Sequence, residues 1–228
     1  GNGADVVRYR STEISANERW KSFGLPYALT DGWVYVRGAS SPVLTIEPGV
    51  EVRFNGGQGM SIGYQQPGGL VAVGTPTEPV RFTSNAAPVA VRQWRGIFFD
   101  PLTTAGTRIE NGVIEGAGSN GEGGATVIGG APTFRGVTVR TNGGAAIRVN
   151  GGTPTIAGCL LQGSRDWDAL GLDARGGTIS LTDTTITGNA GAAMALYLGA
   201  VLEGLTGLTL SGNGADVVRY RSTEISAN

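Results

Sequence analysis

Three short β-strands can be read in the stretch GVTVRTNGGAAIRVNGGTPTIA, residues Gly136–Ala157. In each of its three runs, β-branched or apolar residues alternate with polar ones, which is the pattern of a half-buried strand. Gly, Asn or Pro separates the runs, and glycine readily adopts the positive φ angles that tight corners need. The stretch therefore predicts three strands joined by three corners.

The same pattern recurs through the second half of the chain at nearly constant spacing. The first strand of each unit ends at Asn142, Ser164, Asn189 or Asn213. These first strands lie in GVTVRTN, GCLLQGS, DTTITGN and GLTLSGN; second strands follow in AAIRV, ALGLD, MALYL and DVVRY; third strands lie in PTF, PTI, TISL and VLEG. The recurrence predicts an all-β chain that winds as a parallel β-solenoid of about eight to ten coils with 22–25 residues per coil. A β-sandwich or antiparallel barrel is the alternative, but it needs hairpin loops and no constant spacing.

Alternation along the first strands assigns side chains to the inside and the outside of the coil. The inward positions are Val137, Val139, Cys159, Leu161, Ile186 and Leu210, and the outward ones are Thr138, Thr185 and Thr209. Asn142, Asn189 and Asn213 recur at one corner, which predicts a ladder of stacked side-chain amides. The alternative is that asparagine is there simply because it forms turns well. Cys159 is predicted to be a small buried apolar residue and not a reactive thiol.

The first half of the chain is less regular. Strands are predicted in LTIEPGVEVRF (44–54), GGLVAVGTPTEPVRFTSN (68–85) and WRGIFFD (94–100). The aromatic-rich stretch 18–32 is predicted to interrupt the solenoid as an irregular joint, with Asn17 capping a helical turn. The organisation expected is an end coil at 1–17, the joint at 18–32, regular coils over 33–211 and a further coil beginning at 212–228.

The first seventeen residues, GNGADVVRYRSTEISAN, recur letter for letter as Gly212–Asn228. The recurrence sets a period of 211 residues, so the chain reads as one full repeat of a tandem array followed by the start of the next. An artificial copy of one end onto the other would give the same sequence. If copies meet at this seam, the residues expected to make the contacts are Val6, Val7, Tyr9, Ile14, Trp20, Tyr27, Val217, Val218, Tyr220 and Ile225.

Composition argues against several classes of function. A net charge of −1 with 15% charged residues gives no basic surface for nucleic acid. Histidine is absent, which removes the commonest general base and metal ligand. The single cysteine allows no intrachain disulfide and no cysteine-based zinc site. The sequence predicts no cofactor, no metal and no membrane span, because no apolar run approaches the length of a spanning helix.

The motifs LTIEPGVEVRF, LVAVGTPTEPVRFTS, WRGIFF and IENGVIEGA resemble bacterial right-handed parallel β-helix proteins of the pectate-lyase-like superfamily. The resemblance implies a right-handed winding, as does the general preference of parallel crossovers, and an extracellular or cell-surface location. It also implies tests for polysaccharide cleavage. The His-containing hydrolase motif is absent, and acidic residues are too scattered to suggest the calcium ligands of the lyases.

The best remaining cluster is SRDWDALGLDARGG (164–177), which groups acidic and basic residues around one tryptophan. It gives the candidate carbohydrate-binding residues Arg165, Asp166, Trp167, Asp168 and Asp173. The alternative is a longer corner whose charges pair on the surface. The function expected first is a structural repeat of a secreted fibre, stalk or filament, with further copies of itself as partners and no enzymatic activity. The function expected second is a β-helix that binds or degrades a surface polysaccharide at this cluster.

Overall fold

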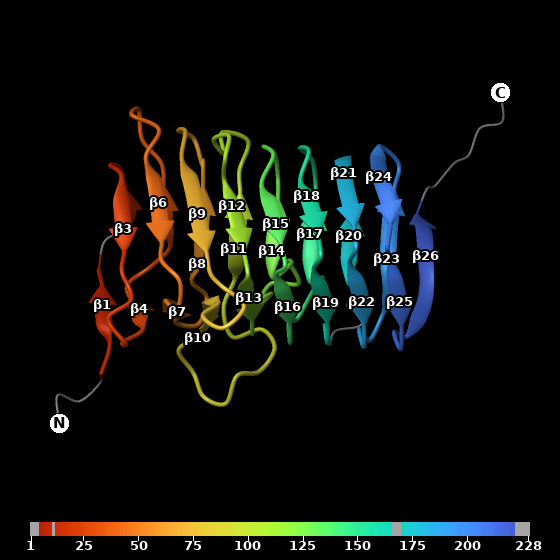
Figure 1. Cartoon of the computed structure of the whole chain (residues 1–228), viewed down its shortest axis with the longest axis horizontal. Coiled ribbons are helices and arrows are strands. Elements are labelled where there is room, and N and C mark those ends of the chain that lie inside the picture. The colour runs from red at the N-terminus through yellow and green to blue at the C-terminus, as the bar shows by residue number, and fades with distance from the viewer. Residues whose placement is uncertain (1–4, 11, 166–169, 222–228) are drawn as a thin grey trace.

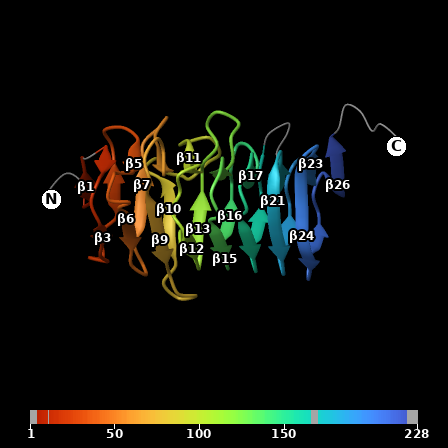
Figure 2. The same cartoon turned by 90° about the horizontal axis from the view of Figure 1, so that it is seen from above.

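The computed structural model describes residues 5–10, 12–165 and 170–221, which wind into a β-solenoid of about eight turns (Figure 1). Every element of the described chain is a strand, and every strand pair is parallel. Each coil places one strand in each of three sheets, here named A, B and C in the order in which the chain visits them. Figures 1 and 2 show the strands stacked along one axis, with β1–β3 at one end and β24–β26 at the other.

Sheets A and B hold nine strands each and sheet C holds eight. Sheet A contains β1 (Val7–Tyr9), β4 (Tyr27–Leu29), β7 (Glu51–Phe54), β10 (Val80–Ser84), β13 (Gly112–Glu115), β16 (Thr138–Arg140), β19 (Leu160–Gln162), β22 (Thr185–Thr187) and β25 (Thr209–Ser211). Sheet B contains β2 (Glu13–Ile14), β5 (Val34–Val36), β8 (Gly59–Ile62), β11 (Gly96–Phe99), β14 (Ala125–Val127), β17 (Ile147–Val149), β20 (Leu172–Ala174), β23 (Ala192–Tyr197) and β26 (Ala215–Arg221). Sheet C contains β3 (Glu18–Trp20), β6 (Val43–Ile46), β9 (Gly69–Val73), β12 (Arg108–Glu110), β15 (Thr133–Arg135), β18 (Thr155–Ala157), β21 (Gly177–Thr182) and β24 (Ala200–Thr206).

The core is a set of apolar columns that run from coil to coil. One inward column in sheet A, traced by strand register, consists of Tyr27, Val52, Phe82, Ile114, Val139, Leu161, Ile186 and Leu210. All of these except Leu210 are buried, whereas the predicted outward residues Thr138 and Thr185 are half-buried and Thr209 is exposed. The inside–outside assignment and the parallel solenoid are confirmed, and the antiparallel alternatives are wrong.

The predicted coil length holds throughout the second half of the chain but not throughout the first. Phe82 and Ile114 are direct neighbours in sheet A, and the coil that joins them is longer than the prediction allows. The extra residues form the long connection between β10 and β11, which hangs away from the strands in Figure 1. A solenoid tolerates such an insertion because the strands on either side still pair in register with their neighbours.

The stretch 18–32 is not the irregular joint that its sequence suggested. It carries β3 and β4, which pair in register in sheets C and A, and no helical turn forms. The Asn17 side chain accepts the Val43 N–H at 2.9 Å, so it bonds the next coil instead of capping a helix. Trp20 and Tyr27 stack with ring centroids 4.9 Å apart inside the solenoid. Trp20 and Tyr27 therefore belong to the core of the first coils, whereas Phe23, the third aromatic residue of the stretch, is exposed.

The predicted asparagine ladder exists between Asn189 and Asn213, where Asn189 Nδ2 donates to Asn213 Oδ1 at 2.9 Å. Asn142 Oδ1 and Asn189 Oδ1 also accept backbone N–H groups from the preceding coil. The ladder is interrupted at Ser164, which holds the same corner position as the asparagines. There Asn142 Nδ2 and Ser164 Oγ are buried without a hydrogen-bond partner.

Replacing Ser164 by asparagine is expected to stabilise the protein by about 1–2 kcal/mol, because the new amide can accept from Asn142 and donate to Asn189. Urea unfolding of the Ser164→Asn protein measures the gain. Ser164→Ala is the matched control, since it removes the buried hydroxyl without supplying an amide. A Ser164→Asn protein no more stable than the alanine variant would contradict the ladder as a source of stability.

Candidate functional site

The predicted carbohydrate cluster is only partly within the described residues. Asp166, Trp167 and Asp168 lie outside them, and Arg165 is exposed, with its backbone N–H bonded to Asn142 O. The Asp173 side chain, on β20, is 1% exposed and accepts from both Arg148 Nε and Arg175 Nε at 2.9 Å. Asp173 is therefore a buried member of an ion-pair triad and is not available as a free carboxylate.

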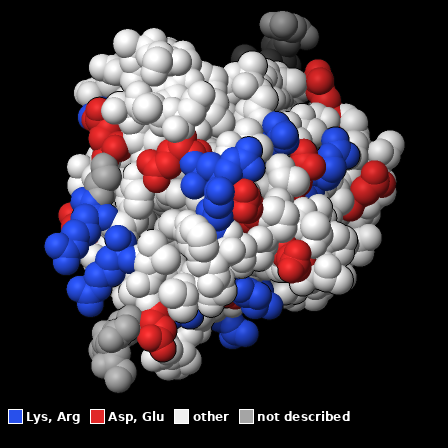
Figure 3. All heavy atoms as spheres, turned by 60° about the vertical axis from the view of Figure 1, so that its left-hand side comes forward, with Lys and Arg blue, Asp and Glu red and all other residues white. Residues whose placement is uncertain are grey.

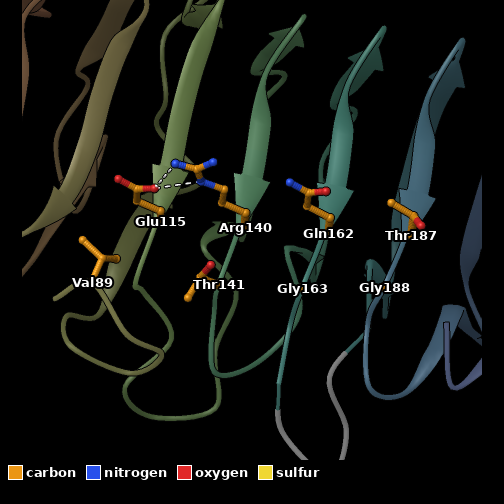
Figure 4. Close-up of a pocket in the computed structure, with 8 residues that line it drawn as sticks. All are labelled: Val89, Glu115, Arg140, Thr141, Gln162, Gly163, Thr187 and Gly188. Carbon is orange, nitrogen blue, oxygen red and sulfur yellow. Dashed lines mark hydrogen bonds and ion pairs between the residues drawn. The ribbon is translucent and has the colours of Figure 1, made fainter. Parts of the chain in front are cut away.

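A groove runs over the outer face of sheet A (Figure 4). One hollow of about 510 Å³ extends across β13, β16, β19 and β22. A second hollow of about 440 Å³ adjoins it and shares two of its lining residues, Val89 and Glu115. Val89 belongs to the long connection between β10 and β11, so this insertion forms one wall of the groove.

Charged side chains in the groove alternate in sign from coil to coil. Arg81 Nη1 donates to Glu115 Oε1 at 2.8 Å, and Arg140 Nε donates to Glu115 Oε2 at 2.8 Å. Arg81 also lies 3.8 Å from Glu51, which in turn bonds Arg53. In the view of Figure 3 acidic and basic side chains are likewise interspersed. The arrangement joins successive coils through their outer surface.

The Glu115 carboxyl stays ionised in this setting. Burial alone raises its pKa, but the hydrogen bonds from Arg140 and Arg81 outweigh burial and bring the pKa below its ordinary value. A group with a lowered pKa in the folded state adds stability above its unfolded pKa, and that stability is lost as the pH falls through the folded pKa. Glu115 is therefore an ionised, structural carboxylate at neutral pH.

Replacing Glu115 by glutamine is expected to cost about 1–3 kcal/mol at pH 7, because two charge-assisted hydrogen bonds are lost. The cost should shrink below about pH 4.3, the unfolded pKa of glutamate, as the wild-type carboxyl is protonated. Urea unfolding of both proteins at pH 7 and pH 3.5 measures the difference. If the two proteins differed in unfolding free energy by the same amount at both pH values, Glu115 could not be the ionised partner of Arg81 and Arg140.

An aromatic pocket on the outer face of sheet B was missed by the sequence analysis. Four rings surround a hollow of about 200 Å³ above strand β8, with Ser61 and Asp100 at its base; the rings belong to Trp33, Tyr35, Tyr64 and Phe98. The Trp33 and Phe98 ring centroids are 5.1 Å apart, and those of Tyr35 and Tyr64 are 5.7 Å apart. A side chain at Gly59 would lie 3.2 Å from the Trp33 indole, so this glycine lets the ring lean over β8.

The base of the aromatic pocket carries a buried carboxyl. Asp100 is 6% exposed and accepts from Ser61 Oγ at 2.6 Å. Burial raises the pKa of Asp100, and the bond from Ser61 only partly offsets that rise. Among the described residues no arginine is within ion-pair distance of Asp100. The carboxyl is therefore a buried polar group in the lining of the pocket.

Two arginines stand at the rim of the aromatic pocket. The Arg37 guanidinium lies 4.8 Å from the Tyr35 ring centroid, and that of Arg95 lies 5.5 Å from the Trp33 ring centroid. Glu13 pairs with Arg37 at 3.0 Å and Glu122 with Arg95 at 3.4 Å, which holds both guanidinium groups in place. The alternation in WVYVR, residues 33–37, was the sequence signal for this face, since it places three large side chains on the outside of one strand.

The predicted seam residues lie at the two ends of the solenoid. Ile14, Trp20 and Tyr27 are buried, while Val6, Val7 and Tyr9 are half-buried. At the other end Val217, Val218 and Tyr220 are exposed, and Ile225 is outside the described residues.

The two copies of the DVVRY strand occupy different sheets. The second copy forms β26 beside β23 in sheet B, as its alignment with MALYL predicts. The first copy forms β1 beside β4 in sheet A, so the same sequence takes a different position at this end of the solenoid.

Within the described residues, His, Cys, Asp and Glu form no group of three that could hold a metal ion, and no helix is long and apolar enough to cross a membrane. Comparison of the chain with protein-family models, with curated proteins and with solved structures finds no match.

Proposed function

We propose that the protein is a structural repeat of a long β-solenoid, in which copies of the 211-residue unit stack end to end. The observation that carries the proposal is the exposure of the inward-facing side chains of β26. By register, Val218 continues the inward column of Met194, and Tyr220 continues that of Leu196. Met194 is buried and Leu196 is half-buried, yet Val218 is 44% and Tyr220 is 56% exposed. A further coil would cover them.

The partner that fits this end is another copy of the same unit. Its first strands run in the same direction as β24–β26, so parallel pairing can continue across the junction without a change of polarity. The exact repetition of seventeen residues indicates that the next copy follows in the same chain. A stack of this kind does not close on itself and grows into a filament. The resemblance to bacterial β-helix proteins supports a secreted or cell-surface fibre.

Small-angle scattering of a tandem chain tests the proposal. Residues 1–211 followed by residues 1–228 should give a rod about 38 Å longer than the single chain, since eight coils at about 4.8 Å each are added. In the second unit, Val7→Asp should shorten or bend the rod, whereas the outward Arg8→Glu should leave it unchanged. Two units connected without a fixed orientation would overturn the proposal.

We also propose that the aromatic pocket binds a sugar ring of a surface polysaccharide. A ring can stack on Trp33 and Tyr35 while Asp100 accepts from its hydroxyl groups and the rim arginines donate to them. At about 200 Å³ the pocket is smaller than the ~300–1,000 Å³ of sites for larger ligands, which suits one ring. Glycosidases use two carboxyl groups and this lining has one, so the activity proposed is binding.

A glycan array followed by calorimetry tests this second function. Trp33→Ala is expected to weaken binding of the identified glycan at least tenfold. Phe23→Ala is the matched control, because Phe23 is a 63% exposed aromatic residue outside the pocket and should leave binding unchanged. Equal losses for the two variants, or an array on which the wild-type protein binds nothing, would reject the pocket as a sugar site.

A further inference from the structure

One short sequence occupies two positions in this molecule. Residues 5–10 and 216–221 are identical, and both copies are described. In the first copy, Val7–Tyr9 form β1 and pair with β4 in sheet A. In the second copy, the equivalent residues belong to β26 and pair with β23 in sheet B. The same residues therefore serve as a strand in either sheet.

Inside a tandem chain the segment has only one of these positions open to it. It follows β25, which lies in sheet A, and only Gly212–Gly214 separate β25 from β26. The chain proceeds from sheet A to B to C, and successive partners in sheet A are separated by a full coil, as Val7 and Tyr27 are. A return to sheet A within a few residues is sterically excluded. At an internal junction the segment must lie in sheet B.

We propose that β1 occupies its position in sheet A only when no preceding copy is present, and that the preceding copy displaces it when units are joined. In the joined state β25 of the preceding copy lies beside β4, and Val7–Tyr9 move to sheet B, between β23 of that copy and β5. The remaining contact of the junction pairs β24 with β3. This inference rests on the proposed tandem array and names the residues through which its units meet.

The strand count supports the exchange. Sheets A and B have nine strands and sheet C has eight. In the joined state β25 of the preceding copy takes the position of β1 beside β4, and Val7–Tyr9 take the position of β2 beside β5. Leaving out β1 and β2 gives eight strands in every sheet. A 211-residue repeat then closes on a whole number of coils, with each β24–β26 end meeting a β3–β5 end.

Side-chain orientation is preserved in both positions. Arg8 is exposed in sheet A, and its equivalent Arg219 is exposed in sheet B, while the flanking Val and Tyr face inward. The inward column that now ends with Val7 over Tyr27 is the column to which Leu210 belongs, so an apolar residue replaces an apolar residue. Because side chains alternate between the two faces with a period of two residues, this sequence can form a strand in either sheet with the same residues facing inward.

In its sheet A position β1 makes several contacts, which the exchange must break. Tyr9 Oη donates to Glu18 Oε2 at 2.9 Å, and its ring lies 5.0 Å from that of Trp20. Val7 N–H donates to Pro26 O at 2.8 Å. These few contacts cover the end of the core when no preceding copy is present, and they are replaced by complete strands when one is.

Disulfide trapping tests the exchange. Arg8 and Ala28 are direct outward neighbours in the sheet A position, and Arg219 and Ala195 are direct neighbours in the sheet B position. Direct neighbours across paired strands lie within the Cα separation that a disulfide spans. Cys159 does not compete, because burial raises its pKa to about 11. The pair Arg53→Cys with Thr83→Cys, from neighbouring interior strands, is the control that should link in every chain.

In the single chain, Arg8→Cys and Ala28→Cys are expected to form a disulfide on mild oxidation. In the tandem chain the same pair in the second unit should link at least tenfold less. There the second unit's Arg8→Cys should link to Ala195→Cys of the first unit. If Arg8→Cys still links to Ala28→Cys in a chain whose scattering shows a single extended rod, the exchange is wrong and the array stands. If linking persists and the rod is absent, both proposals fail.

Discussion

Replacing Asp173 by alanine is expected to destabilise the protein by about 3–5 kcal/mol, the usual cost of removing one partner from a buried ion pair. The carboxylate is 1% exposed and forms ion pairs with two guanidinium groups. Arg148 is itself only 13% exposed, so the variant leaves a positive charge near the interior with no anion beside it. Urea unfolding followed by circular dichroism measures the loss.

Two variants separate this effect from ordinary surface changes. Asp31→Ala alters an exposed aspartate and should shift stability by no more than about 0.5 kcal/mol. Replacing both Asp173 and Arg148 by leucine removes the buried charges together and should recover much of the lost stability. An Asp173→Ala protein within about 1 kcal/mol of the wild type would contradict a structural role for the triad.

Gly68→Ala is expected to cost at least about 3 kcal/mol, because a Cβ at this position has no space. It would lie 1.9 Å from the Val36 carbonyl oxygen and 2.6 Å from the carbonyl carbon. That oxygen accepts the Gly63 N–H at 3.0 Å, so it cannot move aside without breaking a bond between coils. Thermal unfolding compared with Gly56→Ala is the measurement.

Gly56 is the matched control for that substitution. A Cβ there meets its nearest atom, Gln93 O, at an ordinary contact distance of 3.8 Å, and its φ is not positive. Gly56→Ala is therefore expected to be nearly neutral or slightly stabilising, since alanine lowers the entropy of the unfolded chain. Equal losses in the two variants would mean that glycine is needed for chain flexibility and that close packing between coils is not the cause.

The fold of the second half could be predicted from its sequence because two repeating patterns, one within each strand and one from coil to coil, agree there. Alternation along each strand gives its two faces, and recurrence of the strand pattern at the length of one coil gives the next coil. In the first half the second period fails, since the connection between β10 and β11 lengthens the coil that joins Phe82 to Ile114. The aromatic-rich stretch 18–32 resembled a joint in the sequence, although the rings of Trp20 on β3 and Tyr27 on β4 stack in the core.

The candidate sites depended on register between coils, which the sequence of one strand does not contain. Asp173 looked available because its ion-pair partner Arg148 lies one coil earlier in the chain, on the neighbouring strand of sheet B. The aromatic pocket combines Trp33 and Tyr35 with Phe98, which lies two coils away across β8. Only the pairing of β5, β8 and β11 reveals that these rings meet.

Because the proposed repeat contains a whole number of coils, an array would present its binding pockets at regular intervals, which affects avidity. An array of the proposed kind would carry one aromatic pocket per unit, about 38 Å from the next along the axis. A polymer held at one pocket meets the next at a raised effective concentration, so weak single contacts add up to strong attachment. Retention of the polymer would then depend on the number of units in the fibre more than on the affinity of any one pocket.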